Sequence, residues 1–202
     1  LTGLGYDYLM MNESATPHGA VTTAREGEIY AEFLNENRGK YQGVILSLPN
    51  FGDETGAVAA LHKADVPLLI QAYPDDLDKM APAVRRDSFC GKFSVMDVFY
   101  QYGVKFTALK PHTVNPASKR FKQNLDYFAA LCRVVSGLRG MTVGAIGART
   151  TAFKTVRIDE VALQRYGITM ETIDLSHVFF RMKGIKKDAA YKETLNRLEG
   201  LT

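Results

Sequence analysis

Three polar side chains follow apolar, strand-like runs in the first half of the chain, and each has the chemistry to bind a polyol. Asn50 and Asp53 come after the run 44–48, and Gln71 lies at the end of the run 67–72. Amide and carboxylate groups hydrogen-bond hydroxyls, and in open α/β sheets ligands bind beyond the carboxyl ends of the strands. Asp53 is equally suited to cap a helix that starts directly after it, and both roles stay open.

A second group of candidates lies in the segment 85–92, which reads Arg-Arg-Asp-Ser-Phe-Cys-Gly-Lys. Asp87 or Ser88 is suited to cap a helix that runs to about Tyr102. The N–H groups at a helix start attract oxygen-rich ligands, and Lys92 adds a cation near that start. The segment therefore predicts contacts to the same kind of ligand as the strand ends.

The other reactive residue types do not form a recognisable catalytic motif. Cys90 lies near the predicted helix start, but no histidine is close in sequence to activate its thiol. The segment 144–149, which ends in Arg149, suggests a phosphate loop, yet its G-x-x-G spacing differs from the dinucleotide fingerprint. The four histidines are scattered, without a zinc-binding or serine-nucleophile motif. No complete metal or nucleophile site is therefore visible in the sequence.

The elements that must position these residues alternate between strand and helix. Strands are predicted for six short apolar runs, namely residues 6–11, 44–48, 67–72, 104–109, 142–146 and 168–174. Helices are predicted from Thr16 to about Asn37 and from Asn115 to about 138, the second with a clear apolar stripe. This alternation predicts an α/β fold, in which helices flank a parallel sheet in three layers, as in Rossmann and flavodoxin-like folds.

The long predicted helix divides the chain. We expect a first α/β domain over residues 1–115, a linking helix over 116–140 and the start of a second α/β domain over 141–202. The chain opens on Leu1 with what resembles the end of a helix, and it stops at another helix end. We therefore expect a fragment that is truncated at both ends.

Composition narrows the functional classes. The 202-residue chain is 46% hydrophobic and 23% charged, which is typical of a soluble globular protein. Its 25 basic and 22 acidic residues give a net charge of +3, too balanced to favour nucleic-acid binding. No run approaches the ~20 apolar residues that span a membrane, and no secretory signal pattern is present. Cys90 and Cys132 are therefore expected to be reduced thiols in a cytoplasmic protein.

Three segments, taken together and in order, resemble a known enzyme family. They are Leu-Pro-Asn-Phe-Gly-Asp-Glu at 48–54, Arg-Arg-Asp-Ser-Phe-Cys-Gly-Lys at 85–92, and Gly-Ala-Arg-Thr-Thr-Ala-Phe-Lys-Thr-Val-Arg at 147–157. With this spacing they are similar to segments of the L-fucose/L-arabinose isomerase superfamily, in particular its L-fucose isomerase-like branch. The resemblance runs over nearly the whole chain.

The resemblance implies a parent protein of three domains that forms a homo-oligomer and interconverts aldoses and ketoses. It also implies a divalent metal ion, usually Mn²⁺, held by carboxylates and a histidine from later in the parent chain, so no metal ligand is expected here. In the family the first domain contacts the substrate of a neighbouring subunit, and residues 87–92 match the loop that crosses that boundary. Arabinose isomerases carry His-Gly where this chain has Cys90-Gly91, which leaves the sugar open.

We therefore predict the N-terminal part of a metal-dependent sugar isomerase, which supplies substrate contacts and an oligomer interface. The residues expected to contact the sugar are Asn50, Asp53, Gln71, Asp87, Ser88, Cys90, Lys92 and Arg149. The alternative is a non-catalytic sugar- or nucleotide-binding α/β module, which would use the same loops without an acid–base pair. A nicotinamide-dependent enzyme is disfavoured, because no acidic residue stands at the required offset beyond the glycine segment.

Overall fold

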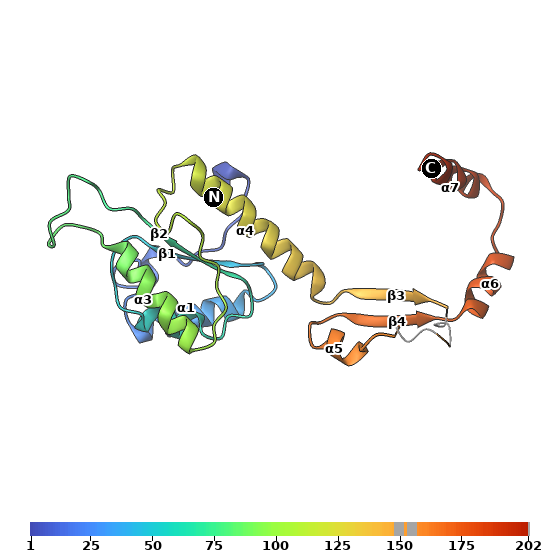
Figure 1. The fold of residues 1–202 in the computed structure, drawn as a ribbon, viewed down its shortest axis with the longest axis horizontal. Helices are drawn as coiled ribbons and strands as arrows, with labels where there is room; N and C mark the ends of the chain where they lie inside the picture. Colours follow the sequence, from blue (N-terminus) through green and yellow to red (C-terminus); the bar gives the residue numbers. More distant parts are fainter. Residues whose placement is uncertain (148–151, 153–156, 202) are drawn as a thin grey trace. The chain divides into compact units, whose positions relative to one another are not determined.

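The computed structural model describes residues 1–147, 152 and 157–201. The chain divides into two compact units, Leu1–Ser136 and Gly137–Thr202 (Figure 1). The first unit contains two short 3-10 helices, η1 and η2, two strands and four helices, of which α4 continues into the second unit. Their bounds are η1 Thr2–Leu4, η2 Glu13–Ala15, α1 Ala24–Glu36, β1 Val44–Leu48, α2 Thr55–Leu61, β2 Leu68–Ala72, α3 Ser88–Gln101 and α4 Lys119–Leu138.

The sheet of the first unit is centred on β2. β1 and β2 are parallel, with Val44 opposite Leu68 and Leu48 opposite Ala72. Isolated parallel bridges from Leu69 to Thr107 and from Ala72 to Thr113 place the chain after α3 on the other edge of β2. All five residues of β2 are buried, as expected for an apolar strand that is covered on both faces.

Helices cover both faces of this sheet. Leu68 and Ile70 belong to a buried cluster with residues of α2 and α3, whereas Leu69 packs with Phe128 and Cys132 of α4. Alternate residues of β2 thus point into opposite layers, as the pleat of a strand requires. The predicted α/β fold, with helices flanking parallel strands, is confirmed, although each sheet is small.

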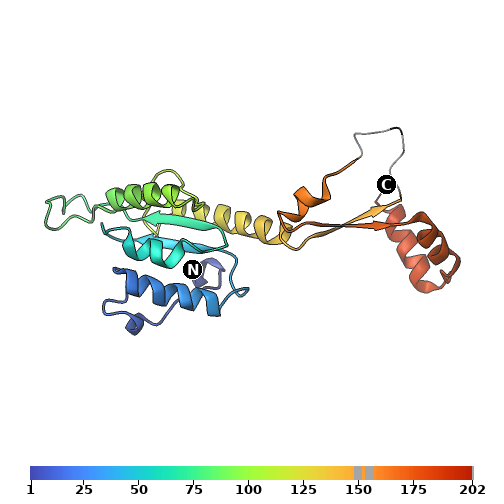
Figure 2. The ribbon, with the colours of Figure 1, turned by 90° about the horizontal axis from the view of Figure 1, so that it is seen from below.

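Helix α1 runs alongside α2 (Figure 2). The two helices approach closely because each has a glycine at the contact. A Cβ atom added to Gly27 would lie 2.5 Å from the Gly56 carbonyl oxygen and 2.6 Å from the Ala59 Cβ. Any larger side chain at Gly27 would therefore push α1 away from α2.

The predicted helix starts were too early. Helix α1 begins at Ala24 instead of near Thr16, because Thr23 and Glu26 complete a capping box there. Helix α4 begins at Lys119, because the Asn115 side chain accepts from Ala117 N and so stabilises a turn before the helix.

Two of the six predicted strands do not form. Residues 6–11 are irregular, since the Tyr6 hydroxyl donates to Asp126 Oδ1 at 2.6 Å and its ring packs against the cluster around Val114 and Phe121. The run 104–109 pairs with β2 only at Thr107. Both segments are anchored by contacts to the body of the unit, so neither relies on a continuous strand ladder.

The second unit contains a parallel pair, β3 Thr142–Ile146 and β4 Thr169–Ile173, with Thr142 opposite Thr169. Its helices are α5 Glu160–Gln164, α6 Leu175–Lys183 and α7 Ala189–Glu199, and each has an aspartate at its N-cap whose side chain accepts a backbone N–H. Both predicted strands are confirmed. No described residue of this unit is buried.

Among the helices of the described residues, none combines the length and the apolar character that crossing a membrane would need.

Candidate functional site

The loop after β1 is attached to the first turn of α3. The Ser88 hydroxyl, which is completely buried, donates to the Pro49 carbonyl oxygen at 2.8 Å, and Phe51 N donates to the Arg86 carbonyl oxygen at 2.6 Å. Gly91 permits this contact, because a Cβ atom there would lie 3.3 Å from the Phe51 Cα. The carboxyl end of β1 and the start of α3 therefore form one structure.

The loop after β2 is attached to the same helix start. Asp75 Oδ1 accepts from Asp87 N at 2.9 Å. The Arg86 side chain lies over the Tyr73 ring, 5.7 Å from its centroid, with its Nε 3.7 Å from Asp76 Oδ2. Residues 49–54, 73–76, 85–92 and 110–114 thus meet at the carboxyl ends of β1 and β2, and we call this set the strand-end cluster.

Asp87 occupies the N-cap position of α3 but does not cap it. Its φ of 53° lies in the left-handed region, and its carboxylate pairs with Arg85 Nη2 at 2.9 Å. No side-chain hydrogen bond caps the first turn of α3. The expected cap by Asp87 or Ser88 is therefore wrong, because the two side chains bond Arg85 and the Pro49 carbonyl instead.

Lys92 is buried beneath the strand-end cluster, with 2% of its surface exposed. Its Nζ donates to the His112 carbonyl oxygen at 2.9 Å. Burial disfavours the charged ammonium and lowers the pKa of Lys92 to about 8. The His112 ring in turn packs edge-on against Phe89, with centroids 6.0 Å apart.

Gln71 is buried and holds the segment that follows His112. Its Nε2 donates to the Val114 carbonyl oxygen at 2.6 Å and to the Ala72 carbonyl oxygen at 3.0 Å. Both hydrogen bonds recorded for this amide go to backbone atoms, which gives Gln71 a structural part in the cluster. Its direct contact with a ligand stays a prediction.

Residues 1–139 match the family described as fucose/sulfoquinovose isomerase, N-terminal domain. The chain belongs to this family. The match confirms the resemblance to an L-fucose isomerase-like N-terminal portion, and it covers the whole first unit, including the strand-end cluster. A search of curated proteins finds no match.

Four more of the predicted contact residues of this isomerase-family chain remain to be placed, namely Asn50, Asp53, Cys90 and Arg149. Asn50 Oδ1 is 3.5 Å from Arg86 Nη1, while Asp53 Oδ1 accepts from Thr55 N at 2.8 Å and so stabilises the start of α2. Cys90 is an exposed free thiol in the first turn of α3. Arg149 lies outside the described residues.

Sequence reasoning missed three residues of the isomerase domain that the fold brings to the cluster. Arg86 contacts both strand-end loops, and Phe89 and His112 form the aromatic pair. Phe89 and Arg86 belong to the segment 85–92 that resembles the isomerase family, but nothing in the sequence distinguished them from their neighbours as site residues. His112 could have been found only from the pairing of Thr113 with the end of β2, which is a tertiary contact.

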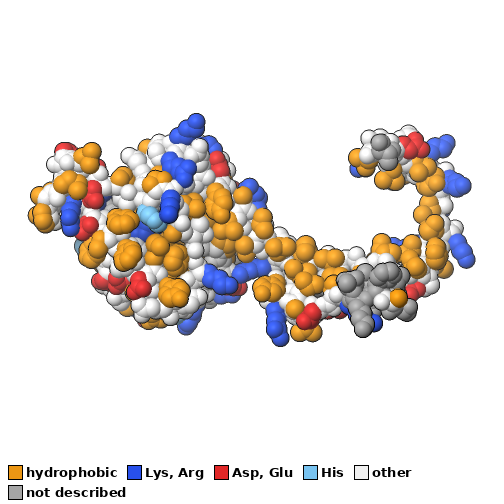
Figure 3. Space-filling view, viewed as in Figure 1, with side chains coloured by type: hydrophobic (Ala, Val, Ile, Leu, Met, Phe, Trp, Pro, Cys, Tyr) orange, Lys and Arg blue, Asp and Glu red, His pale blue; other side chains and the backbone are white. Residues whose placement is uncertain are grey.

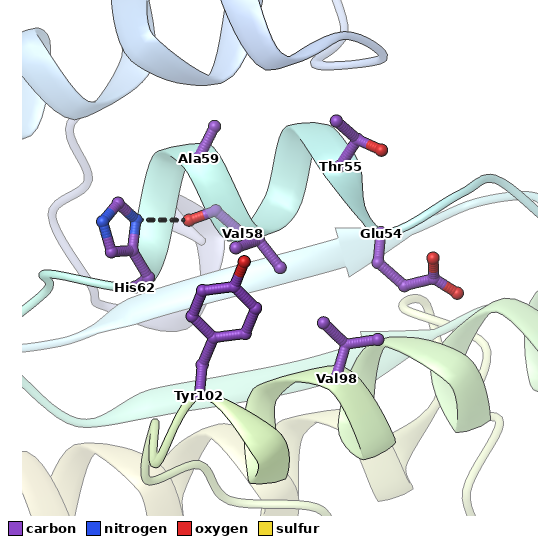
Figure 4. Close-up of a pocket in the computed structure, with 7 residues that line it drawn as sticks. All are labelled: Glu54, Thr55, Val58, Ala59, His62, Val98 and Tyr102. Carbon is purple, nitrogen blue, oxygen red and sulfur yellow. Dashed lines mark hydrogen bonds between the residues drawn. The ribbon is translucent and has the colours of Figure 1, made fainter.

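A separate groove lies between α2 and α3, with a volume of about 420 Å³ (Figure 4). Its lining residues are Glu54, Thr55, Val58, Ala59, His62, Val98 and Tyr102. It is open and mostly apolar, and His62 Nδ1 lies 2.8 Å from the carbonyl oxygen of Val58 in its own helix. None of the predicted contact residues lines it.

A divalent metal ion needs several ligating side chains gathered around it. Among the described residues, no group of three or more His, Cys, Asp or Glu side chains is arranged to hold one. The described residues therefore do not form a Mn²⁺ site themselves, and the family resemblance places the metal ligands elsewhere in the parent chain.

Proposed function

We propose that the first unit is the substrate-contacting domain of an aldose–ketose isomerase, with its sugar contacts on the strand-end cluster. The carrying observation is the match of residues 1–139 to the fucose/sulfoquinovose isomerase N-terminal domain, which covers the unit in which the cluster is built. The cluster also lies at the carboxyl ends of parallel strands, where open α/β sheets bind ligands.

The chemistry of this domain is binding and orientation. Ketol isomerisation moves a proton between two adjacent sugar carbons, which requires the open-chain sugar to be held in one geometry. Exposed Asn50, Asp53 and Cys90 present polar atoms at the cluster, while buried Ser88 and Lys92 hold its backbone. The Mn²⁺ of the parent enzyme would be bound by residues other than those described here.

The charges of the cluster support a neutral sugar over a sulfonated one. A sulfonate calls for arginine or lysine side chains that are available to it. Arg85 is paired with Asp87 and Arg86 with Asp76, at 2.9 and 3.7 Å, and Lys92 is buried. Hydroxyl groups, which accept and donate without a full charge, fit these neighbours better.

An exposed aromatic stripe on α3 supports the proposed homo-oligomer. Phe89, Phe93 and Tyr100 recur at helical spacing and expose 53%, 68% and 79% of their surface. Exposed apolar stripes of this kind mark protein interfaces. We expect Phe93→Glu to lower the oligomeric state in light scattering, whereas Phe179→Glu on α6, with 56% exposed, should not.

The test is turnover by the full-length parent protein with Mn²⁺, using L-fucose, other neutral five- and six-carbon aldoses and sulfoquinovose; residues 1–202 alone should be inactive. We expect ketose formation from a neutral sugar. Turnover of sulfoquinovose alone would contradict the neutral-sugar inference. Metal-loaded protein that binds a sugar without turning it over would favour the non-catalytic binding module, and protein that neither binds nor converts any sugar would refute both.

A further inference from the structure

The backbone that carries His112 is fixed from two sides. Between the bridges at Thr107 and Thr113 the chain has more residues than β2 has between Leu69 and Ala72, so it bulges at 108–112. After the bulge, Val114 N donates to Ala72 O at 2.9 Å and Gln71 donates to Val114 O. Within the bulge, the His112 carbonyl accepts from Lys92.

The hydrogen bond from Lys92 to the His112 carbonyl requires burial of a charged group, which is unfavourable. The Lys92 ammonium is buried, and none of the ion pairs among the described residues includes it. Taking an ammonium group out of water without a carboxylate partner costs free energy, and a methionine would fill similar space without that cost. The hydrogen bond that the cation makes is therefore expected to serve the site rather than stability alone.

The group that Lys92 places has the chemistry to contact a sugar. The neutral imidazole of His112 carries one donor and one acceptor, which is the pair that a hydroxyl group also offers. His112 is only half-buried, and its ring packs against Phe89, which is 53% exposed. A polar ring and an apolar ring thus lie together at the surface of the strand-end cluster.

We propose that His112 is a sugar-contacting residue and that Lys92 is its positioning residue, which fixes the imidazole beside Phe89 by holding the His112 carbonyl. The proposal rests on the proposed function, since it assumes that the strand-end cluster contacts the sugar. It adds a residue and a supporting hydrogen bond that neither the sequence nor the family match indicates.

The test is a double-mutant cycle on the intact protein, with calorimetric binding of L-fucitol, a polyol that cannot isomerise. Loss of a hydrogen bond in each single variant, His112→Ala and Lys92→Met, should weaken binding by about tenfold. Because Lys92 acts through His112, the double variant should bind no more weakly than His112→Ala. Lys105→Met, which removes an exposed lysine, is the matched control and should bind as the wild type does.

A second readout needs no sugar. In protein labelled at histidine, Lys92→Met should shift the His112 ring resonances and weaken the ring contact with Phe89, whereas Lys105→Met should leave both unchanged. Unchanged ring resonances in Lys92→Met, additive losses in the cycle, or normal L-fucitol binding by His112→Ala would each overturn the proposal.

The outcomes separate the two claims. If Lys92→Met does not fold, His112→Ala still decides, since its half-buried ring can be removed without opening the core. If wild-type protein binds neither L-fucitol nor L-fucose, the proposed function fails and the sugar-contacting role of His112 fails with it. The His112 ring resonances of Lys92→Met still test whether Lys92 positions the ring, because that measurement needs no sugar.

Discussion

The two units of the chain use the same elements and differ in what they bury. Each contains a pair of parallel strands in register, β1 with β2 and β3 with β4. All of β2 is buried between helices, whereas β3 is exposed at four of its five residues. Figure 3 shows many hydrophobic side chains on the surface of the second unit as well as on the first.

The difference teaches that strand pairing alone does not build a site. In the first unit, the buried strand gives the loops at its carboxyl end a fixed base, and Ser88, Gln71 and Lys92 tie those loops together from within. The second unit forms the same ladder, but none of its described residues is buried. The family match also covers the unit that has a core.

The difference in burial between the two units is tested most strongly by truncating one phenylalanine in each, for which the largest change in unfolding free energy is expected. Phe99 of α3 is fully buried, so Phe99→Ala should lower the free energy of unfolding by about 3–5 kcal/mol. Phe179 of α6 is 56% exposed, and Phe179→Ala should change it by about 0.5 kcal/mol or less. Chemical denaturation measures both, and equal losses would show that the second unit buries Phe179 after all.

A glycine pair extends the comparison to backbone packing. Gly27→Ala inserts a methyl group against the Gly56 carbonyl and Ala59, and this overpacking should cost about 1–3 kcal/mol of unfolding free energy. Gly137, in the last turn of α4, has open space around it, so Gly137→Ala should be neutral or stabilise by up to about 1 kcal/mol. The thermal unfolding midpoint should fall in Gly27→Ala and stay unchanged or rise in Gly137→Ala, and an equal fall in both would contradict the role given to Gly27.

The same comparison explains how far the sequence could lead. The runs 44–48 and 142–146 form strands at the predicted residues, since a short apolar run between turns is a local signal. Residues 6–11 carry a similar signal, but Tyr6 is used for a side-chain contact with α4, and no local pattern reports that.

The candidate site shows the same limit. Asp53 accepts a hydrogen bond from Thr55 N, although Glu54 and not Asp53 occupies the N-cap position of α2, and Ser88 was rightly placed at a helix start. The partner of Ser88 is the Pro49 carbonyl and that of Lys92 is the His112 carbonyl, each a backbone atom far away in the chain. Such pairs depend on how β1, β2 and α3 pack, so composition and spacing could not reveal them.

A pair of hydroxyl groups sharpens the comparison at the site itself. Ser88→Ala removes the buried hydrogen bond to the Pro49 carbonyl and should cost about 1–2 kcal/mol of unfolding free energy. Thr194 makes a bond of the same length, 2.8 Å, to Ala190 O on the exposed face of α7, and Thr194→Val should cost about 0.5 kcal/mol or less. Denaturant titrations that rank the two variants in the reverse order would contradict a tightly built strand-end cluster.

The smallest expected effect, per pH unit, is the linkage between Lys92 and stability. Burial lowers the Lys92 pKa from 10.5 to about 8, so between these values the unfolded state binds more protons than the folded state. Stability should therefore rise with pH across that window, by at most about 1.4 kcal/mol per pH unit for one proton.

The unfolding free energy of wild type minus that of Lys92→Met should increase from pH 8 towards 10.5 and stay flat below the window. Lys192→Met, at an exposed residue of α7, is the control variant. If the difference in unfolding free energy between wild type and Lys92→Met did not change with pH, the Lys92 ammonium would be solvated. Lys92 would then give no support to the contrast between the buried core of the first unit and the exposed described residues of the second.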